Sequence, residues 1–409
     1  MLPDLRQNGM RYDGSLPIGW KIEPAQKACT KITDGTHDTP TPVSTGRPFI
    51  TAIHVKNGSI NFEDCLYLTE ADHREIFKRC NAQRGDLAIV NIGAGVGECG
   101  FVDVDFEFSM KNVALLKPNP KILDSLFLLH LHQSRKDRIA HVVRSGGAQP
   151  FLSLTELKKL PILLPPLPEQ RRIAEILSRW DGAIETTQKL IANAQAQKKA
   201  LMQSLLTAKK RLPGFDGEWK EMTLEKLAKV TMGSSPPSSS YNELGEGLPL
   251  IQGNADVKNR VSAPRIHTSL ITQKCLPDDI IFSVRAPVGE IAISSHLACI
   301  GRGIAAIQAR SKDDAEFLYY VLLFAESGWA TLSQGSTFQA VNSKDLKGFT
   351  FPAPTEVAER QKIGHVIGEA QKAELLLQSQ LTAFRQEKSA LMQQLLTGKR
   401  RVKIEEHRQ

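Results

Sequence analysis

A glycine-rich stretch, Gly93-Ala94-Gly95-Val96-Gly97, comes closest in this sequence to a loop that could bind phosphate. In dinucleotide-binding proteins such a loop leads straight into a helix, and an acidic residue follows roughly 20 positions later. Here the chain continues instead with a β-strand pattern, Phe101-Val102-Asp103-Val104. The stretch is therefore interpreted as a tight β-turn, and phosphate binding is kept as the less favoured alternative.

Motifs for ATP hydrolysis, adenine methylation and phosphodiester cleavage are missing or incomplete. The only Gly-Lys pair, Gly398-Lys399, is followed by Arg400, whereas a nucleotide-binding P-loop requires Ser or Thr there. The Asn/Asp-Pro-Pro-aromatic motif expected of an adenine methyltransferase does not occur. Pro277-Asp278 could begin a nuclease-like carboxylate cluster, but Glu290-Ile291-Ala292 lacks the lysine that would complete it. We therefore predict no catalytic residue in this chain.

The histidines and cysteines do not form a metal-binding pattern. His130 and His132 lie in a predicted helix at a spacing that points their side chains to different faces. The six cysteines include no C-x-x-C pair and have no clustered histidines beside them, so neither a zinc site nor a disulfide framework is indicated. The chain is expected to bind no metal and no cofactor of its own.

Basic, hydroxyl and amide side chains in loops are the remaining candidates, and their chemistry is binding. In the first half of the chain they are Thr36, His37, Lys56, Asn57, Arg144 and Gln149, and in the second half they are Ser234, Ser235, Arg285, Arg302, Gln334 and Gln339. Such groups bind phosphates and hydrogen-bond to the edges of bases. Each one alone is more often an ordinary surface residue, but two such sets favour nucleic acid over a small ligand. The formal net charge of +8 agrees with an acidic partner and is a weak signal by itself.

Two long helices are predicted to position these loops, because the run from Glu169 to Arg211 recurs from Glu359 without a gap. The matching residues Ala200 and Ala390 define the offset of this repeat. Both copies carry a stripe that alternates steps of four and three residues, which is the seam of a coiled coil. In the first copy the seam is Ile173, Leu177, Trp180, Ile184, Thr187, Ile191, Ala194, Lys198, Leu201 and Leu205, and in the second it is Ile363, Ile367, Ala370, Glu374, Leu377, Leu381, Phe384, Lys388, Leu391 and Leu395.

Each run predicts a helix of roughly 40 residues, or about 60 Å at 1.5 Å per residue. A stripe this narrow and long needs a partner, and the simplest partner is the other copy, packed antiparallel. The alternative, two unrelated helices on separate cores, is disfavoured by the ungapped repeat. The seam residues Lys198, Lys388 and Glu374 either fix the register of the pair or extend to water.

A module of mixed helix and strand precedes each long helix, and the two modules repeat one another with more drift. Trp219-Lys220 matches Trp20-Lys21 in position. The loops differ, because Met232 to Ser238 stands where the first module has Asp34-Gly35-Thr36-His37. A shared scaffold with divergent loops predicts two binding sites for different ligands.

The predicted fold class is α+β, with two similar α/β modules separated by a pair of long antiparallel coiled-coil helices and related by an internal pseudo-two-fold repeat. The modules are placed at residues 1–165 and 212–354. The long helices are placed at residues 166–211 and 355–409, and the second of these segments ends in a short basic tail.

This arrangement resembles the specificity (S) subunits of type I restriction-modification systems. The resemblance rests on the alternation of modules and helices, on the hinge Leu164-Pro165-Pro166-Leu167-Pro168-Glu169-Gln170, and on the similar helix endings Ala200 to Thr207 and Ala390 to Lys399. It covers essentially the whole chain. The second hinge, Pro352-Ala353-Pro354-Thr355-Glu356-Val357, departs from the family's Pro-Pro-x-x-Glu-Gln pattern, which blurs the start of the second helix.

The resemblance implies a protein that binds double-stranded DNA and has no catalytic activity. Each module would be a target recognition domain that reads one half of a bipartite, asymmetric site. The helices would set the spacer between the halves and dock two modification (methyltransferase) subunits, and restriction (translocase/endonuclease) subunits would complete the complex. S-adenosylmethionine, ATP and Mg would be bound by these partner subunits.

The sequence also bears on location. Its longest apolar run is too short to span a bilayer, and its start has no cationic-then-apolar signal pattern. We therefore expect a cytoplasmic protein with no membrane partner.

Two functions of other classes stay open at this point. A complete enzyme, such as a nuclease or methyltransferase fused to a repeated DNA-binding part, is disfavoured by the missing motifs. A scaffold whose helices pair between chains and whose modules bind protein would not show salt-dependent binding of duplex DNA. The residues predict neither the bases that are read nor the length of the spacer.

Overall fold

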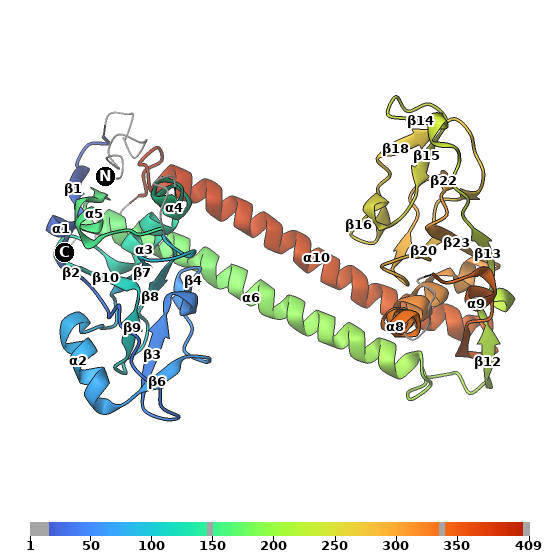
Figure 1. The fold of residues 1–409 in the computed structure, drawn as a ribbon, viewed down its shortest axis with the longest axis horizontal. Helices are drawn as coiled ribbons and strands as arrows, with labels where there is room; N and C mark the ends of the chain where they lie inside the picture. Colours follow the sequence, from blue (N-terminus) through green and yellow to red (C-terminus); the bar gives the residue numbers. More distant parts are fainter. Residues whose placement is uncertain (1–15, 145–149, 335–339, 404–409) are drawn as a thin grey trace. The chain divides into compact units, whose positions relative to one another are not determined.

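The computed structural model describes residues 16–144, 150–334 and 340–403 (Figure 1). The chain divides into two compact units, one made of residues 1–187 and 380–409 and the other of residues 188–379. Each unit therefore combines one module with part of each long helix. The predicted combination of two mixed modules with long helices is confirmed.

The module of the first unit is built on a four-stranded antiparallel sheet in the order β2-β10-β7-β8. These strands are Cys29–Asp34 (β2), Val113–Pro118 (β10), Leu87–Val90 (β7) and Cys99–Phe101 (β8). A second sheet, β6-β3-β9, comprises Leu66–Leu68, Arg47–Thr51 and Ser109–Lys111. Two strand pairs join β4 (Val55–Lys56) to β5 (Ser59–Ile60) and β1 (Lys21–Pro24) to β11 (Pro161–Leu164).

Helices α3 (Ser125–Gln133) and α4 (Lys136–Arg144) form the region in which the sequence predicts a helix that contains His130 and His132. The helix breaks at Ser134, whose N–H donates to the His130 carbonyl and whose hydroxyl donates to the Leu131 carbonyl at 2.7 Å. The remaining helices of this module are α1 (Ala25–Ala28), the 3-10 turn η1 (Ala52–His54), α2 (Glu70–Cys80) and α5 (Leu154–Lys159).

The module of the second unit repeats this plan with a larger sheet, in the order β13-β23-β20-β21-β17-β16. Its strands are Ala228–Met232 (β13), Ile304–Ala309 (β23), Ile280–Ser283 (β20), Ile291–Ile293 (β21), Val261–Ser262 (β17) and Val257–Lys258 (β16). A second sheet, β14-β18-β15-β22-β19, comprises Tyr241–Asn242, Ile266–Thr268, Leu248–Ile251, Ala298–Ile300 and Lys274–Cys275. The first four strands of the larger sheet follow the order of the four-stranded sheet in the first module.

The other elements of the second unit's module are short, apart from one helix. They are the strand pair β12 (Trp219–Thr223) with β24 (Thr350–Pro354), the helices α7 (Leu224–Leu227), α8 (Ala315–Gln334) and α9 (Ser343–Lys347), and the 3-10 turns η2 (Ser238–Ser240), η3 (Asn254–Asp256) and η4 (Lys312–Asp314).

The long helices are α6 (Leu167–Leu205) and α10 (Val357–Leu395), with 39 residues each. They begin and end at matching positions of the repeat, as the sequence predicts. Each ends before a left-handed residue, Ala208 with φ 58° and Gly398 with φ 71°. The helices are therefore shorter than the predicted segments 166–211 and 355–409.

The predicted coiled-coil seam is confirmed within each unit, because every seam position is buried or half-buried. In the first unit the Trp180 and Phe384 rings meet edge to face at 5.6 Å, and Lys388 pairs with Asp181. In the second unit Lys198 Nζ lies 2.5 Å from the Glu374 carboxylate. Both seam lysines are thus neutralised across the helix pair, which favours the interpretation that they fix the register.

A buried carboxylate joins the two long helices to the module in each unit. Glu169 has no exposed surface, and it accepts hydrogen bonds from the Trp20 indole at 3.1 Å and from two nitrogens of Arg401 at 2.6 and 2.8 Å. We call this arrangement the clasp. The second unit repeats it at the matching positions, with Glu359 accepting two bonds of 2.7 Å from Arg211.

The core of each module includes the ends of the long helices. Ile173 and Leu177 near the start of α6, together with Leu395 at the end of α10, are buried in the first module. Leu205 and Ile363 are their counterparts in the second. Among the described residues, no helix combines the length and the hydropathy needed to cross a bilayer.

Arg401→Ala and Arg211→Ala are each expected to lower the free energy of unfolding by clearly more than the loss of an unpaired surface charge does, because each leaves a buried carboxylate without its cation. Denaturant unfolding measures the change. Arg400→Ala and Lys210→Ala are matched controls, since they remove the same charge from the neighbouring exposed position. Equal losses in all four variants would show that net charge, and not the clasp, is responsible.

Candidate nucleic-acid interface

In the first module, loops converge on one end of the four-stranded sheet, where β2 and β7 finish and β10 and β8 begin. We call this the loop end of the sheet. The backbone ties the loops together there, because Gly35 N–H donates to the Val113 carbonyl at 3.0 Å and Asn91 N–H donates to the Asn112 carbonyl at 3.3 Å. Figure 1 shows β2, β7, β8 and β10 side by side.

Two of the predicted site residues, Thr36 and His37, leave the loop end directly after β2. Thr36 N–H donates to the Met110 carbonyl at 2.9 Å, which fixes the loop backbone. The exposed His37 ring lies 3.1 Å from an Asp34 oxygen and 3.3 Å from the Asn112 amide oxygen. His37, Asp34 and Asn112 therefore form a polar cluster at the loop end, which we call the rim of the sheet.

Lys56 ends β4 and Asn57 begins the turn to β5, and both side chains are exposed. The turn adjoins the loop end, because Asn57 N–H donates to a Glu98 carboxylate oxygen at 3.2 Å. Arg144 also reaches this end, and its guanidinium donates to the Ala94 carbonyl in the glycine-rich turn at 2.8 Å. Gln149 lies outside the described residues.

The glycine-rich stretch is a turn between β7 and β8, as predicted. Gly97 N–H donates back to the Val90 carbonyl at 3.0 Å, and β8 begins two residues later at Cys99. Glu98, at the end of this turn, receives a hydrogen bond of 2.8 Å from Lys136. Burial alone would raise the pKa of Glu98, but the hydrogen bonds from Lys136 and from Asn57 N–H lower it overall, so the carboxylate is held in its charged form.

The second module has the same loop end, where β13 and β20 finish and β23 and β21 begin. Gly233 N–H donates to the Ile304 carbonyl at 2.8 Å, and Ser234 N–H donates to the Ile300 carbonyl at 2.9 Å. These bonds mirror those of Gly35 and Thr36. Both glycines are required by close packing, because a Cβ on Gly35 would lie 1.9 Å from the Met110 carbonyl oxygen and one on Gly233 would lie 2.2 Å from the Gly301 oxygen.

Four predicted residues meet at the loop end of the second module. Ser235 and Arg302 are in contact, since Arg302 N–H donates to the Ser235 hydroxyl at 3.1 Å. Ser234 precedes them, and Arg285 follows β20 with an exposed side chain. The side chain of Gln334 and all of Gln339 lie outside the described residues.

Polar residues that the sequence reasoning missed complete both clusters. They are Asn91, Asn112 and Asp34 in the first module and Tyr241, Gln252 and Asn254 in the second. Asn91 is 1% exposed, and neither atom of its amide has a hydrogen-bond partner among the described residues. The Gln252 amide donates to the Tyr241 hydroxyl at 2.8 Å. No local signal marks these residues, because strand pairing across the sheets brings them to the rim.

Comparisons with known proteins agree with this geometry. The family described as the type I restriction modification DNA specificity domain matches residues 45–196 and 216–381, one segment for each module. The putative type I restriction enzyme MjaX specificity subunit of Methanocaldococcus jannaschii is 30% identical over 408 residues, which cover 95% of this chain and 96% of that protein. This chain belongs to the type I restriction-modification specificity family. Its role is to provide DNA sequence specificity.

Solved structures agree with the fold. One, from work on complex assembly and conformational transition of the type I R-M system, is 25% identical, has a TM-score of 0.59 and matches 94% of this chain and 99% of that one. The type I restriction-modification S subunit of M. genitalium has a TM-score of 0.65 at 15% identity and matches 94% of this chain and 98% of its own, which is a likeness of fold alone. A further relative by sequence, the type I restriction enzyme MjaVIII specificity subunit of Methanocaldococcus jannaschii, is 23% identical over 350 residues, which cover 80% of this chain and 81% of that protein.

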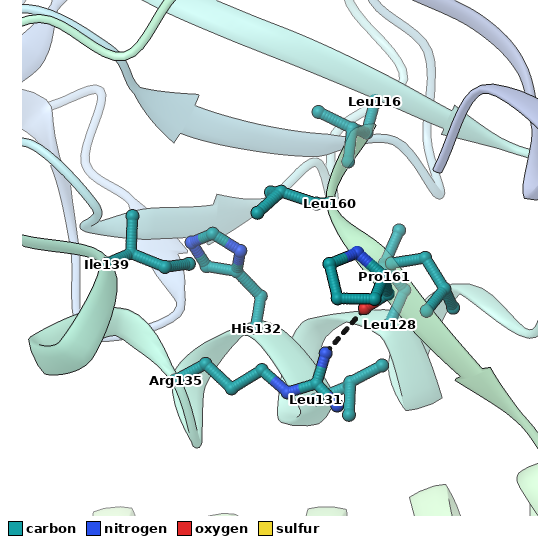
Figure 2. A pocket seen from close by; sticks show the side chains of 9 residues that line it. Leu116, Leu128, Leu131, His132, Arg135, Ile139, Leu160 and Pro161 are labelled. Carbon is teal, nitrogen blue, oxygen red and sulfur yellow. Dashed lines mark hydrogen bonds between the residues drawn. The ribbon is translucent and has the colours of Figure 1, made fainter. Parts of the chain in front are cut away.

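A cavity in the first module of the specificity subunit is too small to be a ligand pocket (Figure 2). It has a volume of about 20 Å³, which is room for one water molecule. Figure 2 shows His132 and Arg135 at its wall, with the Arg135 guanidinium donating to the Pro161 carbonyl at 2.7 Å. The rest of the lining is apolar and comprises Leu116, Leu128, Leu131, Ile139, Leu160 and Ile162.

His130 and His132 are core residues of this module. The His132 ring N–H donates to the Gly97 carbonyl at 2.9 Å, and the His130 ring lies 3.1 Å from the Ser178 hydroxyl of α6. Burial lowers the pKa of His132 to about 4. Burial and the nearby Lys388 lower the pKa of His130 to about 4, although Asp181 opposes them. Among the described residues, no group of three or more His, Cys, Asp or Glu could hold a metal.

These histidines predict that the first module loses stability on acidification. Unfolded histidine titrates near pH 6.5, so between about pH 6.5 and pH 4 the unfolded chain binds more protons and stability falls as the pH falls. From pH 7 to pH 5 each histidine is expected to cost about 2 kcal/mol. Denaturant unfolding of His132→Gln should show a weaker pH dependence. The exposed His141 is the control, and an equal effect of His141→Gln would contradict the assignment.

Proposed function

We propose that each module reads one half of a bipartite DNA site with the loops at the loop end of its sheet. The observation that carries this proposal is that both modules build the same loop end and furnish it with different polar side chains. Thr36 and His37 follow β2, whereas Ser234 and Ser235 follow β13. Two modules that share a backbone fold but differ in their loop side chains are suited to binding two different half-sites.

The polar groups at these rims have the chemistry that base reading requires. Arg302 and Arg285 are exposed guanidinium groups, the type of side chain that binds guanine through two hydrogen bonds. Asn57 is an exposed amide, and amides bind adenine in a similar way. His37, Thr36, Ser234 and Ser235 supply further hydrogen-bonding groups. Arg144 belongs to the rim of the first module, and Gln149, Gln334 and Gln339 stay candidates from the sequence alone.

Helices α6 and α10 are proposed to set the number of unread base pairs and to dock two modification (methyltransferase) subunits. Three leucines of the second unit support a docking role, because they lie exposed on the long helices instead of in the seam. Leu190, Leu375 and Leu376 are 47%, 52% and 71% exposed. Large apolar side chains left exposed outside the seam are candidates for contact with another protein.

The chain is proposed to have no catalytic role in the complex. Methylation would be carried out by the modification subunits with S-adenosylmethionine, and ATP-dependent cleavage with Mg by the restriction subunits. Membrane attachment is not part of the proposal, and we place the complex in the cytoplasm with the DNA it reads.

Exchange of residues 1–165 for the module of a related specificity subunit tests the division of labour. The methylated sequence is expected to change in one half only, because the second module keeps its own loop end. The replacement should retain a tryptophan at the position of Trp20 so that the clasp still forms. Mapping methylated adenines in DNA from cells with the partner subunits gives the result. A change in both halves, or in neither, would refute the proposal.

Arg302→Ala tests base reading by a single residue. Loss of a guanidinium that binds a base should lower binding about 10- to 100-fold and relax one position of one half-site. Arg310→Ala is a matched control, since Arg310 is exposed just beyond the other end of β23. Competition between duplexes altered at single positions measures both effects. Equal behaviour of the two variants would remove Arg302 from the interface.

A further inference from the structure

Both modules carry the same two-residue hairpin turn beside the loop end. In the first module β4 and β5 are joined by Asn57 and Gly58, with φ of 55° and 88°. In the second, β16 and β17 are joined by Asn259 and Arg260, with φ of 51° and 60°. Two positive φ angles in succession define a type I′ turn, which matches the twist of the strands on either side. The turn is therefore part of the shared frame.

A lysine directly precedes the turn in each case. Lys56 pairs in register with Ser59, and Lys258 pairs with Val261. Both lysine side chains are exposed, and so are the asparagines that follow them. Lys56 and Asn57 are among the residues predicted from the sequence, whereas Lys258 and Asn259 are not, because the two hairpins are further apart in the chain than the offset of the long helices.

An ion pair with a helix anchors the first hairpin at the loop end. The Asn57 and Gly58 N–H groups donate to the Glu98 carboxylate at 3.2 Å and to the Cys99 carbonyl at 2.9 Å. Lys136 at the start of α4 holds Glu98 from the other side at 2.8 Å. The positive charge of Lys56 also lowers the pKa of Glu98. Glu98 therefore offsets part of that charge, while the Lys56 side chain is exposed to solvent.

The second hairpin is anchored from the equivalent helical position with the opposite charge. Glu326 in α8 matches Lys136 in α4 under the same offset as the long helices, and it accepts two hydrogen bonds of 2.8 Å from Arg260. Arg260 also donates to the Ile291 carbonyl at 2.9 Å. The anchoring residues thus differ between the modules, whereas the exposed lysine and asparagine are the same.

We infer that Lys56 and Lys258 bind the phosphate backbone of DNA. Each lysine positions its module on the duplex and does not read the bases. This inference rests on the proposed function. Two half-sites that differ in bases share only their sugar-phosphate backbone, so a cation that two otherwise unlike readers expose at the same turn is suited to the phosphates of that shared part. A lysine is a point charge that tolerates variation in phosphate geometry, and the anchored turn presents it in a fixed place.

The test uses the complex assembled with its modification subunits and two duplexes of equal length, one with the mapped methylation site and one scrambled. Binding is measured by fluorescence anisotropy over a series of NaCl concentrations. Lys56→Gln and Lys258→Gln should each reduce the slope of log K against log salt by about one. Affinity for both duplexes should fall by the same factor, and the methylated sequence should stay unchanged.

Lys121→Gln and Lys312→Gln are the matched controls. Both lysines are exposed, and they follow β10 and β23 at the end of each sheet opposite to the loop end. An unchanged salt slope, an equal change in the controls, or a new methylated sequence in the hairpin variants would overturn the inference. If the unaltered complex does not prefer the mapped duplex to the scrambled one, the proposed function itself fails.

Discussion

The clasp between a buried carboxylate, an indole and a guanidinium is the interaction on which each unit depends. Transfer of a carboxylate out of water costs several kcal/mol, which only close and complete pairing can offset. Glu169 accepts two hydrogen bonds from Arg401, and Glu359 accepts two from Arg211. Trp20 and Trp219 add an indole N–H at 3.1 and 3.4 Å. The two helices and the module therefore assemble in one arrangement.

A rigid frame explains how the two modules can carry unlike loops. At the loop ends, backbone groups hold the first loop residues, with Thr36 N–H and Ser234 N–H each donating to a strand carbonyl at 2.9 Å. Because these hydrogen bonds join backbone atoms only, the side chains of the loop residues can differ while the loop backbone keeps its conformation. Stability is supplied by the core beneath the loops, and specificity is free to vary at the rim.

Much of the fold was predictable because its signals are local and periodic. The seam from Ile173 to Leu205 repeats every three or four residues, and the ungapped second copy identified its partner. The rim clusters were only partly predictable. His37 and Asn112 are 75 residues apart in the chain and meet through the pairing of β2 with β10. The break between α3 and α4 was not predictable, because apolar residues continue on both sides of Ser134.

Burial explains which ion pairs the two halves of the chain share. The clasp uses the same three residue types in both units, because a carboxylate with no exposed surface cannot tolerate a missing partner. The pairs that anchor the hairpins are partly exposed, at 26% and 25% for Lys136 and Glu98 and 47% and 23% for Arg260 and Glu326. Water can compensate a change there, so the helix carries a lysine in one module and a glutamate in the other while the position of the hairpin is kept.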